Sequence, residues 1–187
     1  MTIELMGEKP MPLRFCSGVF ALVICFSAFA EDEDLPIKRL SWLVGNWETR
    51  DEQVDGDYSE TGPRSCEWGL NGRYIVCTGV GTNHLGRSRE YIWYFNYNHM
   101  EERFEMNSLY GDWPRKNLFI IEVSENNHRL KAMSYFFTAD GLEAGNPQVV
   151  EYDGSHQYVW TILNGDPDPE TGEPTAGFVD TATRVSE

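Results

Sequence analysis

A regular succession of strand-like segments and turn signals is the feature that most limits how this chain can fold. From Cys66 onward, short segments rich in aromatic and β-branched residues are separated by Gly, Asn, Asp and Pro. Short connections are expected at residues 71–72, 98–101, 124–128 and 153–156. Longer connections are expected between them, at residues 81–88, 111–117, 138–147 and 164–177. This pattern predicts an antiparallel up-and-down meander.

The meander predicts an all-β, calycin-like barrel of about ten strands with a short N-terminal helix closing one end. The helix is expected at residues 36–44, where apolar residues recur at helical spacing. Successive connections alternate between the two ends, so the short turns should gather at one end and the long loops at the other. A polar stretch at 51–63 is interpreted as a bend after the first strand. The strands are expected from Asn46 and at 65–70, 73–80, 89–97, 103–110, 118–123, 129–137, 148–152, 157–163 and 178–185.

Residues 1–30 have the pattern of a secretory signal peptide. A basic Arg14 precedes a largely apolar stretch at 15–26, and Ala28-Phe29-Ala30 is a cleavage signal. The apolar stretch is shorter than a typical membrane-spanning helix. Cleavage after Ala30 would leave residues 31–187 as a single domain in the periplasm or outside the cell. The alternative is a lipoprotein signal ending at Cys25, although that motif requires a small residue where Ile24 stands.

The charge of the chain argues against some classes of partner. With 15 Lys and Arg residues against 30 Asp and Glu residues, the formal net charge is −15. Nucleic acid and anionic membrane surfaces would repel such a protein, and its basic residues are scattered along the sequence. We therefore expect no nucleic-acid partner. The simplest interpretation of the acidity is that it keeps a secreted protein soluble.

Cys66 and Cys77 flank an expected hairpin. Asn71-Gly72 between strand-like residues is a strong signal for a two-residue turn, and counting back from it places Cys66 opposite Cys77. The counting makes them a hydrogen-bonded pair, with Cα atoms about 5.5 Å apart. A disulfide is predicted, worth about 2 kcal/mol because its loop is short. Two buried free thiols are the alternative.

Gly45-Asn46-Trp47, after the short helix, resembles the G-x-W signature of the calycin group, which includes lipocalins and fatty-acid-binding proteins. In that group an arginine near the end of the last strand packs across the tryptophan, and Arg184 is at the matching position. The segments 40–48 and 70–74, with the aromatic strand that follows, resemble a bacterial secreted family of lipocalin-like domains of unknown function. This resemblance implies a barrel with a structural Trp47–Arg184 pair and implies little about chemistry.

The leading functional hypothesis is a small-molecule binding module for an apolar or aromatic ligand. Strand aromatics would line the barrel and rim residues would gate it. The expected lining residues are Trp68, Trp93 and Phe95, and the expected gate is Tyr110, Trp113 and Arg115. The structural alternative is that Trp113 packs a rim loop while Arg115 is solvated. A barrel packed solid, serving as a cell-envelope interaction protein, is another alternative.

Other chemistries have weaker support. A small hydrolase-like enzyme would use His84 and Asp112 of the rim as an acid–base pair. Three further histidines are expected in short turns, where solvation is the usual state, and an acidic loop at 166–173 departs from calcium-loop spacing. No histidine lies in mid-strand as a haem ligand. We therefore expect no metal and no cofactor. The turn histidines are His99, His128 and His156.

Overall fold

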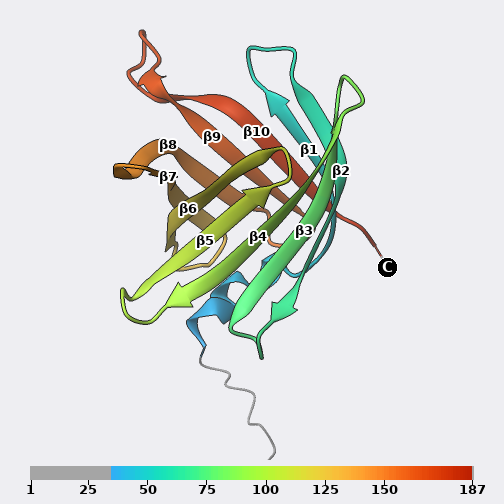
Figure 1. The fold of residues 1–187 in the computed structure, drawn as a ribbon, viewed down its shortest axis with the longest axis vertical. Coiled ribbons are helices and arrows are strands. Elements are labelled where there is room, and N and C mark those ends of the chain that lie inside the picture. The colour runs from blue at the N-terminus through green and yellow to red at the C-terminus, as the bar shows by residue number, and fades with distance from the viewer. Residues whose placement is uncertain (1–34, 187) are drawn as a thin grey trace, which may run out of the picture. The chain divides into compact units, whose positions relative to one another are not determined.

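The computed structural model describes residues 35–186, and the predicted signal peptide lies outside them. Ten antiparallel strands form a closed barrel in which each strand pairs with its neighbours in the chain and β1 pairs with β10 (Figure 1). The predicted fold class is confirmed. The elements are η1 (Pro36–Leu43), β1 (Gly45–Gln53), β2 (Ser59–Gly69), β3 (Tyr74–Asn83), β4 (Ser88–Asn98), β5 (Arg103–Tyr110), β6 (Trp113–Val123), β7 (Arg129–Thr138), β8 (Gly141–Tyr152), β9 (Gln157–Pro167) and β10 (Pro174–Arg184).

The prediction of long loops at one end is wrong. Strand pairing continues through most of the expected loops, which leaves connections of similar length at both ends. The polar stretch at 51–63 likewise belongs mainly to β1 and β2. Register shifts between β5 and β6, β7 and β8, and β9 and β10 let these strands accommodate Gly, Asn and Pro without ending the ladder. The rim therefore consists of projecting hairpins (Figure 1).

The short helix at one end of the barrel is a 3₁₀ helix. Ile37, Leu40 and Leu43 are fully buried and belong to the barrel core. Arg39 attaches the helix to the β6–β7 turn, because its Nε donates to Asn127 Oδ1 at 2.8 Å and its Nη2 donates to backbone carbonyls of the same turn. The helix thus closes the end of the barrel at which the β2–β3, β4–β5, β6–β7 and β8–β9 turns lie (Figure 1).

Trp47 and Arg184 meet at the closed end, across the β1–β10 pair that closes the barrel. The guanidinium carbon of Arg184 lies 4.2 Å from the centre of the Trp47 ring. Arg184 also donates to the carbonyls of Val44 at 2.8 Å and Trp42 at 2.7 Å. A Cβ on Gly45, which has φ +138°, would overlap the Arg184 guanidinium, so this position requires glycine. One arginine thus joins the helix, the first strand and the last strand.

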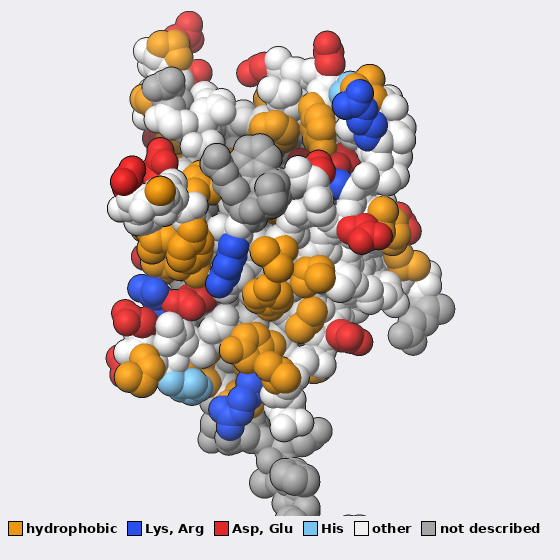
Figure 2. Space-filling model, viewed as in Figure 1, with side chains coloured by type: hydrophobic (Ala, Val, Ile, Leu, Met, Phe, Trp, Pro, Cys, Tyr) orange, Lys and Arg blue, Asp and Glu red, His pale blue; other side chains and the backbone are white. Residues whose placement is uncertain are grey.

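The interior of the barrel divides into two halves. Next to the helix the core is apolar, with fully buried Ile75, Phe95, Met106, Leu130 and Val150. Towards the projecting hairpins the inward positions carry charged and polar side chains. The outer surface also exposes hydrophobic side chains, which gather over the middle of the face formed by β3 to β6 (Figure 2).

Cys66 and Cys77 form the predicted disulfide between β2 and β3. Their Cα atoms are 4.0 Å apart, closer than the hydrogen-bonded pair that was expected. The turn includes Leu70 and Arg73 as well as Asn71-Gly72, with the last strand pair at Gly69 and Tyr74. This longer turn shifts the alternation of pair types by one position, which makes the cysteines a non-hydrogen-bonded pair.

We predict that Arg184→Ala lowers the free energy of unfolding by about 2–4 kcal/mol, because the variant loses the stack on Trp47 and leaves two carbonyls without their donor. Arg184→Lys should recover part of the loss. Arg73→Ala, which removes an exposed arginine, should change stability by less than about 0.5 kcal/mol. Urea denaturation followed by tryptophan fluorescence measures all three. Equal effects of Arg184→Ala and Arg73→Ala would contradict this role for the stack.

We also predict that reducing the disulfide costs about 2–3 kcal/mol of stability, because it releases a constraint on the unfolded chain across a sequence separation of 11 residues. A strong reductant should lower the urea midpoint of the protein and have no effect on the Cys66→Ala/Cys77→Ala double variant. A midpoint that is the same in oxidising and reducing buffer would refute the prediction.

Candidate functional site

Five charged side chains face the interior from four strands. They line a cavity of about 90 Å³ together with aromatic, aliphatic and neutral polar residues. Charges are costly to place inside a barrel, so their arrangement identifies the candidate site. The charged residues are Asp51 of β1, Glu60 and Arg64 of β2, Arg89 of β4 and Asp180 of β10.

The inner cavity adjoins a wider pocket of about 680 Å³ at the end with the projecting hairpins. The two hollows share Asp51, Glu60, Arg89, Tyr110 and Ile162 as lining residues. We call the wider pocket the mouth. The shared residues form the passage from the mouth to the inner cavity, so a molecule entering between the hairpins meets the charged groups first.

Arg64 is the centre of the buried network, with only 4% of its surface exposed. Its Nε donates to Tyr91 Oη at 3.0 Å, its Nη1 donates to Tyr158 Oη, and its Nη2 donates to Asp180 Oδ2 at 2.7 Å. The guanidinium also lies over the Trp93 ring, with its carbon 4.0 Å from the ring centre. Burial raises the pKa of the Tyr158 hydroxyl, so this group stays neutral and accepts the hydrogen bond from Arg64.

Glu60 and Arg89 form a second ion pair nearer the mouth. Glu60 is buried and accepts hydrogen bonds from Arg89 Nε at 3.0 Å and from Tyr58 Oη at 2.8 Å, and the closest nitrogen–oxygen distance of the ion pair is 2.7 Å. Arg89 also lies over the Tyr110 ring at 4.9 Å from its centre. Burial raises the pKa of Tyr110 to about 12, so its hydroxyl is neutral at physiological pH. The second pair is therefore satisfied within the protein.

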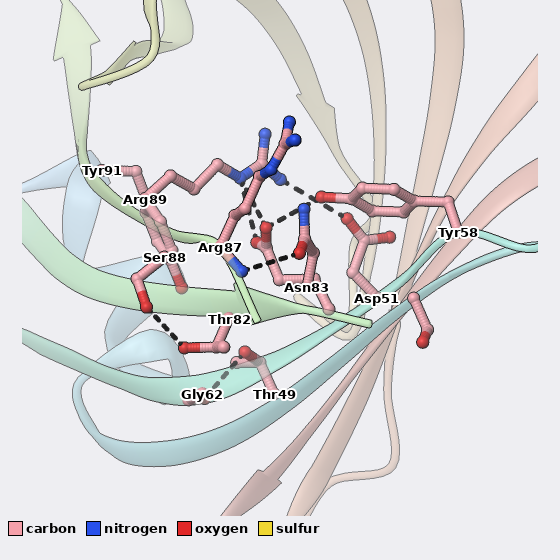
Figure 3. Close-up of polar contacts among 12 residues, drawn as sticks. Thr49, Asp51, Tyr58, Gly62, Thr82, Asn83, Arg87, Ser88, Arg89 and Tyr91 are labelled. Atoms are coloured by element: carbon pink, nitrogen blue, oxygen red, sulfur yellow. Dashed lines mark hydrogen bonds and ion pairs between the residues drawn. The ribbon is translucent and has the colours of Figure 1, made fainter. Parts of the chain in front are cut away.

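Asp51 differs from the other carboxylates of the cavity because its contact with a cation is much longer than theirs, which are at 2.7 Å. It stands directly across the β1–β10 pair from Asp180, and its nearest cation is Arg89, at 3.9 Å (Figure 3). Burial, and secondly the charge of Asp180, raise the pKa of Asp51 from 3.8 to about 7. Near neutral pH the Asp51 carboxyl is therefore close to its own pKa, and it lines the cavity together with Asp180.

Two polar atoms at the cavity have no hydrogen-bond partner among the described residues. They are the indole N–H of Trp93, whose side chain is 7% exposed, and Oδ1 of Asp180. By contrast, the neighbouring Trp160 donates its N–H to Gln148 Oε1 at 2.6 Å. Buried polar groups normally have partners, so a free donor and a free acceptor lining one hollow indicate a place where a ligand or water binds.

The predicted ligand-binding residues lie in different places. Trp93 and Tyr110 line the inner cavity. Phe95 is fully buried in the apolar half, and Trp68 lies under Lys38 at the closed end, with the amine 4.5 Å from its ring centre. Trp113 and Arg115 lie at the start of β6, paired with the end of β5, and their side chains lie outside the described part of the structure. The ligand-binding role of each of these residues stays a prediction.

The sequence interpretation missed the charged residues, although period-two alternation is a signal that identifies them. Trp47-x-Thr49-x-Asp51 continues inward from the buried tryptophan of the G-x-W signature. Glu60 and Arg64 likewise share a face with Cys66. Charged residues on the inward face of a strand are the feature that points to this site.

The other residues considered for chemistry lie apart. His84 is exposed and packs against Tyr58, with ring centres 6.0 Å apart, and no hydrogen bond or ion pair joins it to Asp112 among the described residues. Asp112 is exposed and lines the mouth. His99 contacts Tyr97, whereas His128 contacts Tyr152 and His156 contacts Asp153. Within residues 35–186 no group of three or more His, Cys, Asp or Glu side chains could hold a metal ion.

The acidic loop at 166–173 uses one of its carboxylates within its own turn. Asp168 Oδ1 accepts hydrogen bonds from the backbone N–H groups of Glu170 and Thr171, both at 2.8 Å, and these bonds lower the pKa of Asp168. No helix in the described part of the chain is long and apolar enough to cross a membrane.

Comparison with known proteins supports the fold alone. No family model matches the chain, and no curated protein is significantly similar to it. The crystal structure of Rv2717c from M. tuberculosis is similar with a TM-score of 0.56 and 11% identity, over 80% of this chain and 97% of that chain. Two designed barrels score lower. The redesigned barrel mFAP1, bound to DFHBI, has a TM-score of 0.43 at 14% identity over 78% and 99%. A de novo designed fluorescence-activating barrel has a TM-score of 0.40 at 13% identity over 78% and 96%.

We predict that Asp51 makes the stability of the protein fall as the pH rises from about 4.5 to 7.5. Its pKa is raised, so between 3.8 and about 7 the folded protein retains a proton that the unfolded chain has released. The fall should be about 1–3 kcal/mol, reduced by solvent screening because the side chain is 27% exposed. Asp51→Asn should flatten the profile, and Asp140→Asn, in an exposed turn, should leave it unchanged. Urea denaturation across this pH range tests the prediction. If the stability of Asp51→Asn falls with pH as much as that of the unchanged protein, the pH dependence does not come from Asp51.

Proposed function

We propose that this protein is a small-molecule binding module whose ligand enters through the mouth and binds in the charged cavity of the barrel. The observation that carries the proposal is the pairing of an enclosed hollow with unpartnered polar atoms, the Trp93 N–H and Asp180 Oδ1. A hollow of this kind is the usual form of a ligand site in a small domain. The closed barrel supplies a rigid frame around it.

The energetic cost of the network supports a role in function. Replacing buried ion pairs by packed apolar side chains is often neutral or stabilising. Stabilisation of the fold is therefore a weak explanation for the buried Arg64–Asp180 pair. The half of the barrel next to the helix shows that this chain can fill its interior with apolar side chains. Charged side chains take the place of apolar ones only in the half of the barrel that opens to the mouth.

The dimensions of the cavity set the size of the ligand. A volume of about 90 Å³ is far below the 300–1,000 Å³ of typical drug-sized sites, so the enclosed part suits a single small ring. The ring would lie among the aromatic side chains of Trp93, Trp160 and Phe119. Larger substituents would extend into the mouth. The ligand is therefore a compact ring with hydrogen-bonding groups, and long-chain lipids do not fit the enclosed part.

The disulfide supports an oxidising compartment, because such bonds persist mainly in secreted and periplasmic proteins. Together with the predicted signal peptide at residues 1–30, it supports a periplasmic or extracellular binding protein. Loops and hairpins around the mouth would then face molecules of the envelope or the surroundings.

We predict that ligands from a panel of small aromatic and heteroaromatic compounds with hydroxyl, carbonyl or amine groups quench tryptophan fluorescence and raise the melting temperature. Trp93→Phe keeps a ring and removes the free N–H, so it should weaken binding about 3- to 10-fold. Trp42→Phe is the matched control, because Trp42 Nε1 is also buried and unpartnered but lies at the closed end, stacked on Tyr152. Titration calorimetry measures each affinity. Absence of binding across the panel, or equal weakening in both variants, would refute the proposal.

A further inference from the structure

Two carboxylates of the cavity, those of Asp51 and Asp180, keep oxygens that accept no hydrogen bond from the described residues. Each nitrogen of the Arg64 guanidinium already donates to a protein oxygen. Arg89 Nε donates to Glu60. Asp180 Oδ1 has no partner among the described residues, and the nearest cation to Asp51 is at 3.9 Å, which is too far for a hydrogen bond. The Trp93 N–H is a further buried polar group at the cavity without a partner among the described residues.

The charges lining the cavity give the same result. The three carboxylates Asp51, Glu60 and Asp180 outnumber the two arginines, so the fully ionised lining has a formal charge of −1. Glu60 and one oxygen of Asp180 are paired within the protein, which leaves the excess charge on the Asp51–Asp180 side of the cavity. The strongly acidic protein as a whole also attracts cations towards its surface.

We infer that the ligand of this cavity is a small organic cation, an ammonium or amidinium group on a compact ring, held by Asp51 and Asp180 from the paired strands β1 and β10. The inference rests on the proposed function and specifies its ligand class. The cation would donate to Asp180 Oδ1 and to the Asp51 carboxylate, and the ring would lie among Trp93, Trp160 and Phe119. An acceptor on the ligand, such as a hydroxyl, would satisfy the Trp93 N–H.

Binding of a cation should be coupled to ionisation of Asp51. The groups facing Asp51 are Asp180 from β10, Arg89 from β4, and Glu60 and Arg64 from β2, with the Tyr58 hydroxyl nearby. The two carboxylates raise its pKa and the two arginines lower it. A bound cation adds a positive charge and favours the ionised form. Affinity should therefore rise about 10- to 30-fold from pH 5.5 to 8, with release of up to one proton per ligand below pH 7.

The test uses three probes of nearly equal shape and different charge: benzylammonium, benzyl alcohol and benzoate. Titration calorimetry of the protein at pH 7.5 should give the ammonium at least 10-fold tighter binding than the alcohol, with benzoate weakest. Repeating the ammonium titration in two buffers of different ionisation enthalpy at pH 6 measures proton release directly. This measurement needs no variant, so it is independent of any effect of a substitution on folding.

Asp51→Asn should reduce the preference for the ammonium over the alcohol to about 3-fold or less and remove the rise of affinity with pH. Asp140→Asn, the same change in an exposed turn, should keep both properties. If the alcohol or benzoate binds as well as the ammonium, the cation inference fails and the binding function stands. If none of these probes and no member of the aromatic panel binds, the proposed function fails and the inference fails with it.

Discussion

The pairing of β1 with β10 is the interaction on which the rest of the structure depends, because it turns a ten-strand meander into a closed barrel. The inward positions of this pair carry both of the features that matter. Trp47 stands opposite Arg184 at the closed end, and Asp51 stands opposite Asp180 in the cavity. Two steps of period-two alternation separate the structural stack from the carboxyl pair. A slip of either strand by one residue would turn that strand's two side chains outward.

Small residues on β3 create the room that the charged network needs. A Cβ on Gly79 would overlap the ring of Tyr91, and a Cβ on Gly81 would overlap the carboxylate of Glu60. Tyr91 accepts from Arg64, and Glu60 accepts from Arg89, so each glycine holds open the place of one acceptor. The two ion pairs can therefore lie side by side because β3 presents no side chains at these inward positions.

The fold was predictable because turn signals and aromatic strands are local properties of the sequence. The Asn71-Gly72 turn placed Cys66 opposite Cys77, and the G-x-W signature placed Trp47 beside Arg184, as the structure shows. The length of the connections was not predictable. Gly, Asn and Pro normally end a strand, but between 138 and 147 the register shift of the β7–β8 pair keeps the ladder intact through them. Turn residues indicate that the backbone bends, but they do not indicate whether strand pairing ends at the bend.

The site was only partly predictable, because aromatic residues in strands indicate the interior of a barrel, whereas charged residues are normally expected on its surface. Trp93 and Tyr110 were found by their type. Asp51 and Arg64 were not, because they lie in or beside the polar stretch at 51–63, where no strand was expected. Asp180 lies within the expected strand 178–185, and a charged side chain there was not assigned to the interior. Once β1 is known to run from Gly45 to Gln53, Asp51 must share the face of Trp47, and the same counting from Arg184 places Asp180 beside it.

The two arginines of the network have close ion pairs within the protein, whereas the Asp51 carboxylate has only a long contact with a cation. Arg64 lies over Trp93 and Arg89 lies over Tyr110, so aromatic faces and protein oxygens together neutralise the arginines without a ligand. Asp180 is paired with Arg64, but Asp51 receives no equivalent compensation, since among the described residues its contact with a cation is at the limit of an ion pair. In a low-dielectric interior an uncompensated carboxylate either takes up a proton or binds a cation. Asp51 can take up a proton without a ligand, and the mouth gives a cation access to the cavity.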